Sequence, residues 1–274
     1  MEIVPLSAAL GAEILGIDAA RPISQETFSR VEKAWPEHLV ILLRGQSLDE
    51  EQQVAFAQRF GELSPIHTDH HSATNKSVMY IGNRKKDGKH IGALPLGEMQ
   101  FHSDQCYQER PAMATMLYSI EIPAEGGNTL FANGYKAYEA LSDTVKRKID
   151  KKKAVQVYDY GGGVLDRRHM VKPEAGVSFA HPVFRTHPAT RRKSLYVNRL
   201  MTHHIEGLPE EQSEALLQLL FDTLEHPDFI YEHRWRVGDL LLWDNRCTLH
   251  ARRDFDPHES RWMRRVTIKG DRPR

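Results

Sequence analysis

A His-x-Asp pattern occurs repeatedly in this chain and could hold a metal ion. On a β-strand, side chains two positions apart point to the same side, so both would face one ion. Two His and one carboxylate on one face leave three coordination positions open, an arrangement typical of non-haem Fe(II) oxygen chemistry. The chain has 15 His among its 274 residues. The pattern starts at His67, His102 and His226, and with Glu in place of Asp at His204.

Three of these four matches are poorly placed for a strand. The match at 226 contains a proline, which cannot donate to a strand ladder. The match at 67 sits in a polar stretch, and the match at 204 precedes Gly-Leu-Pro, which is typical of a helix start. The pair His102 and Asp104 therefore remains as the metal-ligand candidate.

Composition excludes several classes of partner. The chain has 37 basic and 37 acidic residues, so it lacks the excess positive charge that is typical of proteins that bind nucleic acid or an anionic membrane. No segment approaches the ~18 consecutive apolar residues of a membrane span, and the N-terminus does not resemble a signal peptide. Cys106 and Cys247 cannot build a disulfide framework, and we interpret them as packing residues. We expect a cytoplasmic protein with no nucleic-acid or membrane partner.

The elements that must position the candidate ligands are mostly short strands. Helical periodicity covers 26–35, 48–60, 135–149 and 209–224. Strand-like runs cover 39–43, 78–81, 113–120, 129–131, 154–158, 194–197, 229–235, 239–243 and 262–268. Because the strands do not alternate regularly with helices, the pattern favours a mainly β fold with flanking helices, such as a jelly roll. We expect one domain over residues 1–274. The stretches 66–76 and 159–176 are expected to be loops, either lids over a site or plain surface segments.

Several motifs together resemble the TauD/TfdA family of Fe(II)- and 2-oxoglutarate-dependent dioxygenases. They are Phe101–Asp104, Gly126–Phe131, Trp243–His250, Arg261 and Arg265, and the match also covers 11–18 and 59–63. The resemblance spans nearly the whole chain. It implies a double-stranded β-helix (jelly roll) in which His102, Asp104 and His250 ligate iron, while Thr129 and Arg261 hold the co-substrate.

The two C-terminal arginines fit the charge of such a co-substrate. A dicarboxylate that chelates iron through its keto-acid end needs its far carboxylate neutralised, and arginine stays charged and binds carboxylates bidentately. Arg261 and Arg265 are four residues apart on a strand-like run, so they share one face and Arg264 opposes them. We expect Arg261 at the distal carboxylate and Arg265 nearer the iron and the substrate. Trp243 is either a pocket residue or a core aromatic.

The resemblance also implies a reaction. Fe(II), 2-oxoglutarate and O2 would give succinate, CO2 and a hydroxylated substrate, and a hydroxylated carbon that bears an ether oxygen would then lose that bond. The taurine-type members carry an Asn shortly before the first metal His, and residues 96–100 contain none. The stretches 185–188, 204–209 and 243–250 look closer to the 2,4-dichlorophenoxyacetate-type members.

We therefore expect a small organic acid as substrate, an aryloxyalkanoate cleaved at its ether linkage. A taurine or alkylsulfonate dioxygenase, or a dioxygenase of another small carboxylate, is the alternative. Arg265 and one residue of a loop group are candidates to pair with the substrate's anion. The loop group comprises His67, His70, His71 and Lys89, for which plain solvated residues are the other interpretation.

Two rival functions are less well supported. A jelly-roll ligand-binding protein would be expected to have lost a ligand, and none of the three is missing. A zinc hydrolase built on the cluster 67–71 would need a His-Glu-x-x-His helix, which the sequence lacks. A homo-oligomer is the expected assembly.

Overall fold

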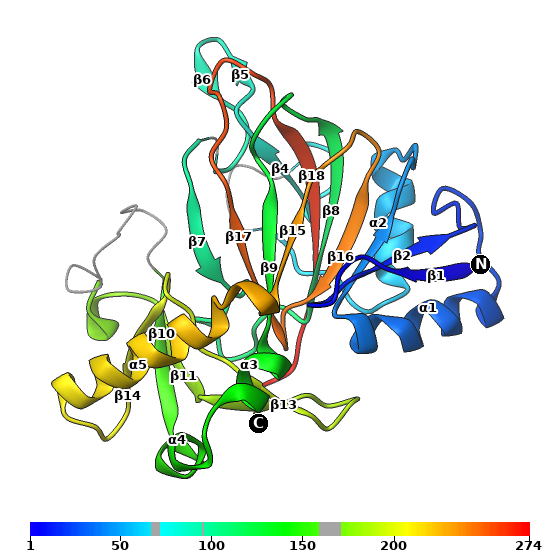
Figure 1. Cartoon of the computed structure of the whole chain (residues 1–274). Helices are drawn as coiled ribbons and strands as arrows, with labels where there is room; N and C mark the ends of the chain where they lie inside the picture. Colours follow the sequence, from blue (N-terminus) through cyan, green and yellow to red (C-terminus); the bar gives the residue numbers. More distant parts are fainter. Residues whose placement is uncertain (67–71, 95, 159–170) are drawn as a thin grey trace.

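The computed structural model describes residues 1–66, 72–94, 96–158 and 171–274. Within them the chain is mainly β, with helices at the flanks (Figure 1), as the sequence predicted. The helices are α1 (Gln25–His38), α2 (Glu50–Gln58), α3 (Gly134–Ala140), α4 (Asp143–Ile149) and α5 (Glu210–Leu224). None of the described helices combines the length and apolar character needed to cross a bilayer.

Two sheets form the centre of the molecule. The larger has the order β1-β2-β3-β16-β8-β18-β4 and the smaller has the order β15-β9-β17-β7. The strands of the larger sheet are β1 (Glu2–Pro5), β2 (Ala12–Leu15), β3 (Val40–Leu43), β16 (Leu240–Asp244), β8 (Ala114–Glu121), β18 (Trp262–Ile268) and β4 (Val78–Gly82). Those of the smaller sheet are β15 (Ile230–His233), β9 (Thr129–Asn133), β17 (Thr248–Arg252) and β7 (Met99–His102).

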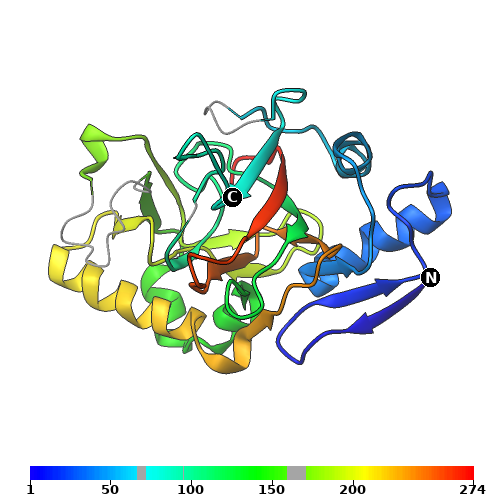
Figure 2. The same ribbon diagram turned by 90° about the horizontal axis from the view of Figure 1, so that it is seen from above.

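Three smaller groups of strands complete the fold. One sheet has the order β11-β10-β14, with β11 (Ser178–Pro182), β10 (Lys153–Val157) and β14 (Thr202–Ile205). The two ribbons are β12 (Phe184–Thr186) with β13 (Lys193–Leu195), and β5 (Lys85–Lys86) with β6 (Lys89–His90). Seen from above, the β1–β2 hairpin lies at one end of the molecule and α5 lies towards the other (Figure 2).

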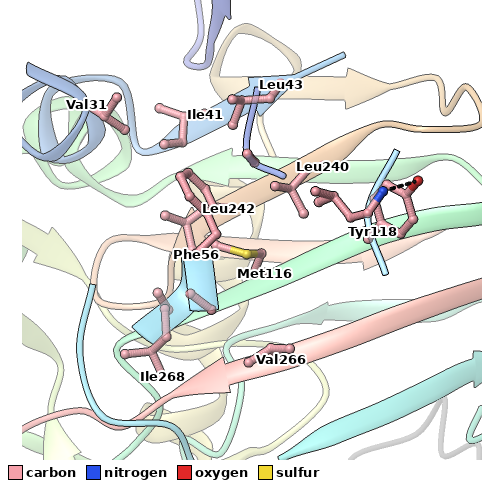
Figure 3. Close-up of a cluster of buried hydrophobic side chains, with 14 of the residues drawn as sticks. Val31, Ile41, Leu43, Phe56, Met116, Tyr118, Leu240, Leu242, Val266 and Ile268 are labelled. Carbon is pink, nitrogen blue, oxygen red and sulfur yellow. Dashed lines mark hydrogen bonds between the residues drawn. The ribbon is translucent and has the colours of Figure 1, made fainter. Parts of the chain in front are cut away.

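Period-two alternation divides the larger sheet into two apolar faces. Ile41 and Leu43 of β3 pack with Leu242 of β16 and with α1 and α2 in one buried cluster (Figure 3). Their neighbours Val40 and Leu42 belong instead to a second cluster, which includes residues of the smaller sheet. Because successive strand residues point to opposite faces, the continuous apolar run of β3 is buried on both sides. One face is therefore covered by helices, and the other faces the smaller sheet.

Local capping decides where two of the helices begin. Asp49 and Gln52 form a reciprocal capping box at the start of α2, which shortens the predicted helix 48–60 to Glu50–Gln58. The single helix predicted over 135–149 is wrong. The chain turns extended at Leu141, and the Ser142 hydroxyl accepts the backbone N–H of Val145 to begin α4. The predicted start of α5 after Pro209 is confirmed, although His204 just before it lies in strand β14 rather than at a helix entry.

Candidate active site

Strand pairing brings two distant histidines together. His250 on β17 is the direct register partner of His102 on β7, and the two strands lie side by side in Figure 1. Asp104 follows β7 after one further residue. The candidate ligand atoms of His102, Asp104 and His250 all lie within 4.8 Å of one another. The three residues that the sequence singled out therefore form one buried cluster.

Burial keeps both imidazoles neutral. It lowers the pKa of His102, and burial, followed by the proximity of the His102 imidazole, lowers the pKa of His250. The Nδ1 of His102 lies 2.9 Å from the carbonyl oxygen of Gln100, which can only accept, so Nδ1 carries the proton. The lone pair of His102 Nε2 then faces Asp104 Oδ1 at 3.9 Å. A neutral imidazole is the form that binds a metal ion.

Asp104 is held as a carboxylate. Burial raises its pKa, but the charge of Arg265, followed by the proximity of the two imidazoles and the hydrogen bond from Thr115, outweighs this effect and holds the pKa well below its usual range. Arg265 Nη2 lies 2.9 Å from Asp104 Oδ1, and Thr115 Oγ1 donates to Asp104 Oδ2 at 2.5 Å. One ionised carboxylate with two neutral imidazoles is a donor set that fits a divalent transition metal.

A buried amide orients this carboxylate indirectly. Asn245 donates through Nδ2 to Thr115 Oγ1 at 3.0 Å and accepts from Trp243 Nε1 at 3.0 Å. The hydroxyl of Ser103 donates to the backbone carbonyl oxygen of Asn245 at 2.8 Å. Neither Thr115 nor Asn245 stood out in the sequence as a site residue. The only signal for Asn245 was its place inside the 243–250 motif.

The cluster opens into a cavity of about 670 Å³, and all seven predicted site residues line it. They are His102, Asp104, Thr129, Trp243, His250, Arg261 and Arg265. The prediction that Arg261 and Arg265 share one face of the strand is confirmed, because both line the cavity. Arg264 points to the opposite face and donates to Gln53 Oε1 at 2.7 Å. Trp243 is both a pocket residue and part of a core cluster.

Thr129 and Arg261 mark one end of this cavity. The Thr129 hydroxyl accepts from Trp235 Nε1 at 3.0 Å, and Arg261 Nε donates to the Gly127 carbonyl at 3.2 Å. Gly127 has φ +64°, and a Cβ there would lie 3.1 Å from Arg261 Cδ, so only glycine leaves room for this arginine. Burial, followed by the charge of Arg252, lowers the pKa of Arg261 to about 9. A buried arginine of this kind favours an anionic ligand.

Aromatic and amide side chains line another part of the cavity. Tyr107 and Tyr158 meet edge to face with ring centroids 4.7 Å apart. Burial, followed by the proximity of Tyr158, raises the pKa of Tyr107, so its phenol stays neutral. Gln105 and Gln108 also line the cavity, and Gln105 has a left-handed backbone with φ +57°. This wall offers flat apolar surface together with hydrogen-bonding groups.

None of the other candidate residues that the structure describes lines the cavity. His67, His70 and His71, with most of the 159–176 stretch, fall outside the described residues. Lys89 is exposed on β6 and does not line the cavity described here. The 226 match lies at an exposed 3-10 turn, with His226 Nδ1 3.7 Å from Asp228 Oδ2. Cys106 and Cys247 are buried and unpaired by disulfide.

A second buried group of potential ligands is already hydrogen-bonded. His187 Nε2 donates to Asp244 Oδ2 at 3.0 Å, while its Nδ1 accepts from the backbone N–H groups of Ala189 and Thr190. Arg246 binds both oxygens of Asp244. Because these side chains satisfy one another, we interpret the group as structural.

The chain is similar to known proteins over most of its length. A family model described as "Taurine catabolism dioxygenase TauD, TfdA family" matches residues 2–267. Pentalenolactone F synthase of Streptomyces arenae is 31% identical over 100% of this chain and 97% of the relative. The alpha-ketoglutarate-dependent 2,4-dichlorophenoxyacetate dioxygenase of Burkholderia sp. is 32% identical over 89% of this chain and 86% of the relative.

One solved structure supports the fold in particular. The crystal structure of AAD-2 in complex with Mn(II) and N-oxalylglycine superposes with a TM-score of 0.85 at 30% identity. The match covers 99% of both chains. The likeness therefore extends over nearly the whole fold.

Proposed function

Because the chain belongs to the TauD/TfdA family and is an alpha-ketoglutarate (2-oxoglutarate)-dependent dioxygenase, we propose that it binds Fe(II) and hydroxylates a small organic acid. The observation that carries this proposal is the His102, Asp104 and His250 cluster, buried beside two arginines in one cavity. When bound, Fe(II) supplies the activation of O2 and the coupled oxidative decarboxylation that yields succinate and CO2.

We assign the metal to the three clustered side chains. The two neutral imidazoles each offer a nitrogen, and the ionised Asp104 offers an oxygen. Hydrogen bonds from Arg265 and Thr115 fix the carboxylate before any ion arrives. Such outer-shell partners orient metal ligands and tune their affinity.

The two arginines divide the anions between them. Arg261 is the anchor for the distal carboxylate of 2-oxoglutarate, with Thr129 beside it. Arg265 lies next to Asp104 and is therefore the residue that pairs with the acid group of the primary substrate. Guanidinium groups bind carboxylates with two parallel hydrogen bonds, which also fixes orientation. Trp243 packs against His250, with ring centroids 4.8 Å apart, and limits the space around the imidazole.

The substrate is an aryloxyalkanoate that is cleaved at its ether linkage. The 2,4-dichlorophenoxyacetate dioxygenase relative acts on such an acid by its name, and the Tyr107 and Tyr158 pair supplies an aromatic wall for a ring. Hydroxylation of the carbon that bears the ether oxygen gives a product that releases the phenol. A dioxygenase of another small carboxylate is the second candidate, because pentalenolactone F synthase is an equally similar relative.

Three broader assignments accompany this function. The two main sheets form the two halves of a double-stranded β-helix (jelly roll), with the metal ligands on the smaller sheet and just beyond it. Residues 1–274 form one catalytic domain. The protein works as a cytoplasmic homo-oligomer without nucleic-acid or membrane partners.

Succinate release tests the proposal. Protein reconstituted with Fe(II) under anaerobic conditions would receive 2-oxoglutarate, O2 and one acid at a time: phenoxyacetates, phenoxypropionates, taurine, alkylsulfonates or none. We expect the phenoxy acids to raise succinate well above the no-acid control. The His102→Ala variant should be inactive, whereas His226→Ala, from the exposed copy of the same sequence pattern, should match the wild type. Stimulation by sulfonates alone would contradict the aryloxy assignment.

A further inference from the structure

Arg252 is a buried cation in the same cavity that no part of the proposed mechanism uses. It ends strand β17 two residues after His250, and both side chains line the cavity. Its register partner on β9 is Thr129, which marks the end assigned to 2-oxoglutarate. The guanidinium carbons of Arg252 and Arg261 lie 5.9 Å and 6.0 Å from the centroid of the Phe255 ring. Both cations therefore lie close to the same buried aromatic ring.

Within the described part of the chain, neither cation forms an ion pair with an acidic side chain, although the exposed Asp254 carboxylate raises the pKa of Arg252 and so offsets part of its burial. Arg252 and Arg261 are 9% and 2% exposed, yet their hydrogen bonds go to backbone carbonyls. Buried arginines elsewhere have better-matched partners, such as Arg246, which binds Asp244 bidentately. Burying a charge without a counter-charge costs free energy unless a ligand supplies one. The charge at this end thus exceeds what Arg261 alone provides.

The guanidinium of Arg252 also forms hydrogen bonds to a segment of the cavity wall. Its Nη1 donates to the Leu94 carbonyl at 2.6 Å, and its Nε donates to the Gly97 carbonyl at 3.2 Å, with Nη2 also bound to Gly97. Leu94 lines the cavity, and the chain continues from Gly97 into β7, which carries His102. Arg252 therefore connects β17, which carries His250, to the segment that leads into β7, which carries His102.

We propose that Arg252 is a positioning residue for the dicarboxylate co-substrate: its charge adds to that of Arg261 at the distal carboxylate, while its donors hold the Leu94 and Gly97 wall. This inference rests on the proposed function, which places 2-oxoglutarate at the Arg261 end. Arg252 does not need to contact the ligand, because a buried charge acts over several ångströms. The charge favours keto acids that carry a second carboxylate over those that do not.

Calorimetric binding of two keto acids to the Mn(II)-loaded protein tests this role without turnover. The ligands are 2-oxoglutarate and 2-oxopentanoate, which lacks the distal carboxylate. We expect Arg252→Gln to weaken 2-oxoglutarate binding about tenfold and to change 2-oxopentanoate binding by less than about twofold. The neighbouring Arg253→Gln is the matched control, since Arg253 is exposed and lies 3.5 Å from Glu98. It should change neither affinity.

Arg252→Lys separates charge from hydrogen bonding. Lysine keeps the charge but lacks the planar guanidinium whose several N–H groups reach both carbonyls. The Arg252→Lys protein should therefore retain the preference for the dicarboxylate but melt at a lower temperature than the wild type. An equal loss for both keto acids in Arg252→Gln, or no loss for either, would overturn the proposal. Failure of the wild type to bind 2-oxoglutarate would instead overturn the proposed function.

Discussion

Arg265 Nη2 lies 2.9 Å from Asp104 Oδ1. Arg265 belongs to β18 of the larger sheet, whereas Asp104, a candidate metal ligand, comes just after β7 of the smaller sheet. The contact links the two sheets across the cavity. It keeps the carboxylate ionised and places a guanidinium next to the reacting centre. Arg265 also lines the cavity. Its guanidinium has five N–H donors, so it can serve Asp104 and a substrate anion at the same time.

Replacing this arginine should affect the primary substrate most. We expect Arg265→Gln to raise the KM for the acid substrate about 100-fold, because a bidentate ion pair in a buried site is lost. The affinity for 2-oxoglutarate should change far less, since Arg261 is retained. Steady-state kinetics with each ligand varied separately gives both values. Equal losses for the two ligands would show that Arg265 does not distinguish them.

The hydroxyl of Thr115 should control metal affinity. Thr115→Val removes the donor to Asp104 Oδ2 with little change in shape, and loss of such an outer-shell bond typically costs about 10–100-fold in affinity. Mn(II) titration followed by calorimetry measures this. Thr115→Ser keeps the hydroxyl and should bind like the wild type. Thr248→Val is the control, because the Thr248 hydroxyl is buried without a partner among the described residues.

The aromatic wall should select for aryl acids. We expect Tyr107→Leu to raise the KM for phenoxyacetates by about fivefold or more, because contact with an aromatic ring is lost. The KM for an alkyl acid of similar length should change by less than about twofold. Competition between the two acids in one assay measures the ratio directly. An unchanged ratio would mean that Tyr107 takes no part in substrate choice.

Acid stability should depend on Asp244. Burial raises the pKa of Asp244, but the charge and hydrogen bonds of Arg246, followed by those of His187, outweigh it and hold the pKa well below its usual range. A carboxyl with a lowered pKa stabilises the fold above its unfolded pKa of about 4, and this stability is lost as the pH falls. We expect Asp244→Asn to lower the free energy of unfolding at neutral pH by about 3 kcal/mol.

Denaturant unfolding at a series of pH values tests the sign of this effect. Between about pH 5 and pH 3, the stability of the wild type should fall more steeply than that of Asp244→Asn. Exposed Asp228→Asn is the control and should keep the wild-type slope. Parallel slopes for wild type and Asp244→Asn would show that this carboxyl does not account for the acid sensitivity.

Local patterns predicted a substantial part of this molecule. The period-two rule placed Arg261 and Arg265 on one face and Arg264 on the other, since it depends only on neighbouring residues. The register of His102 against His250 depends on how distant strands pair, and only the resemblance to the family suggested it. The break between α3 and α4 was missed although Ser142 is a local cap signal, because apolar periodicity continues across it.

The supporting residues were harder to predict. Nothing in the local sequence distinguishes three of them, Thr115, Asn245 and Arg252, from other residues of strands and turns. Their importance lies in hydrogen bonds to residues far away in the sequence. Such contacts exist only once the sheets have formed. The sequence therefore identified candidate ligands through their chemistry, but not the side chains that orient them.

Reaction under isotopically labelled O2 tests the central claim most directly. The Fe(II)-loaded protein would be given 2-oxoglutarate and a phenoxyacetate, and the succinate analysed by mass spectrometry. We expect one labelled oxygen atom in each succinate from the wild type, because the dioxygenase places one atom of O2 in that carboxylate, and no succinate above background from His250→Ala. Unlabelled succinate, or equal amounts from the two proteins, would contradict a 2-oxoglutarate-dependent dioxygenase centred on His102, Asp104 and His250.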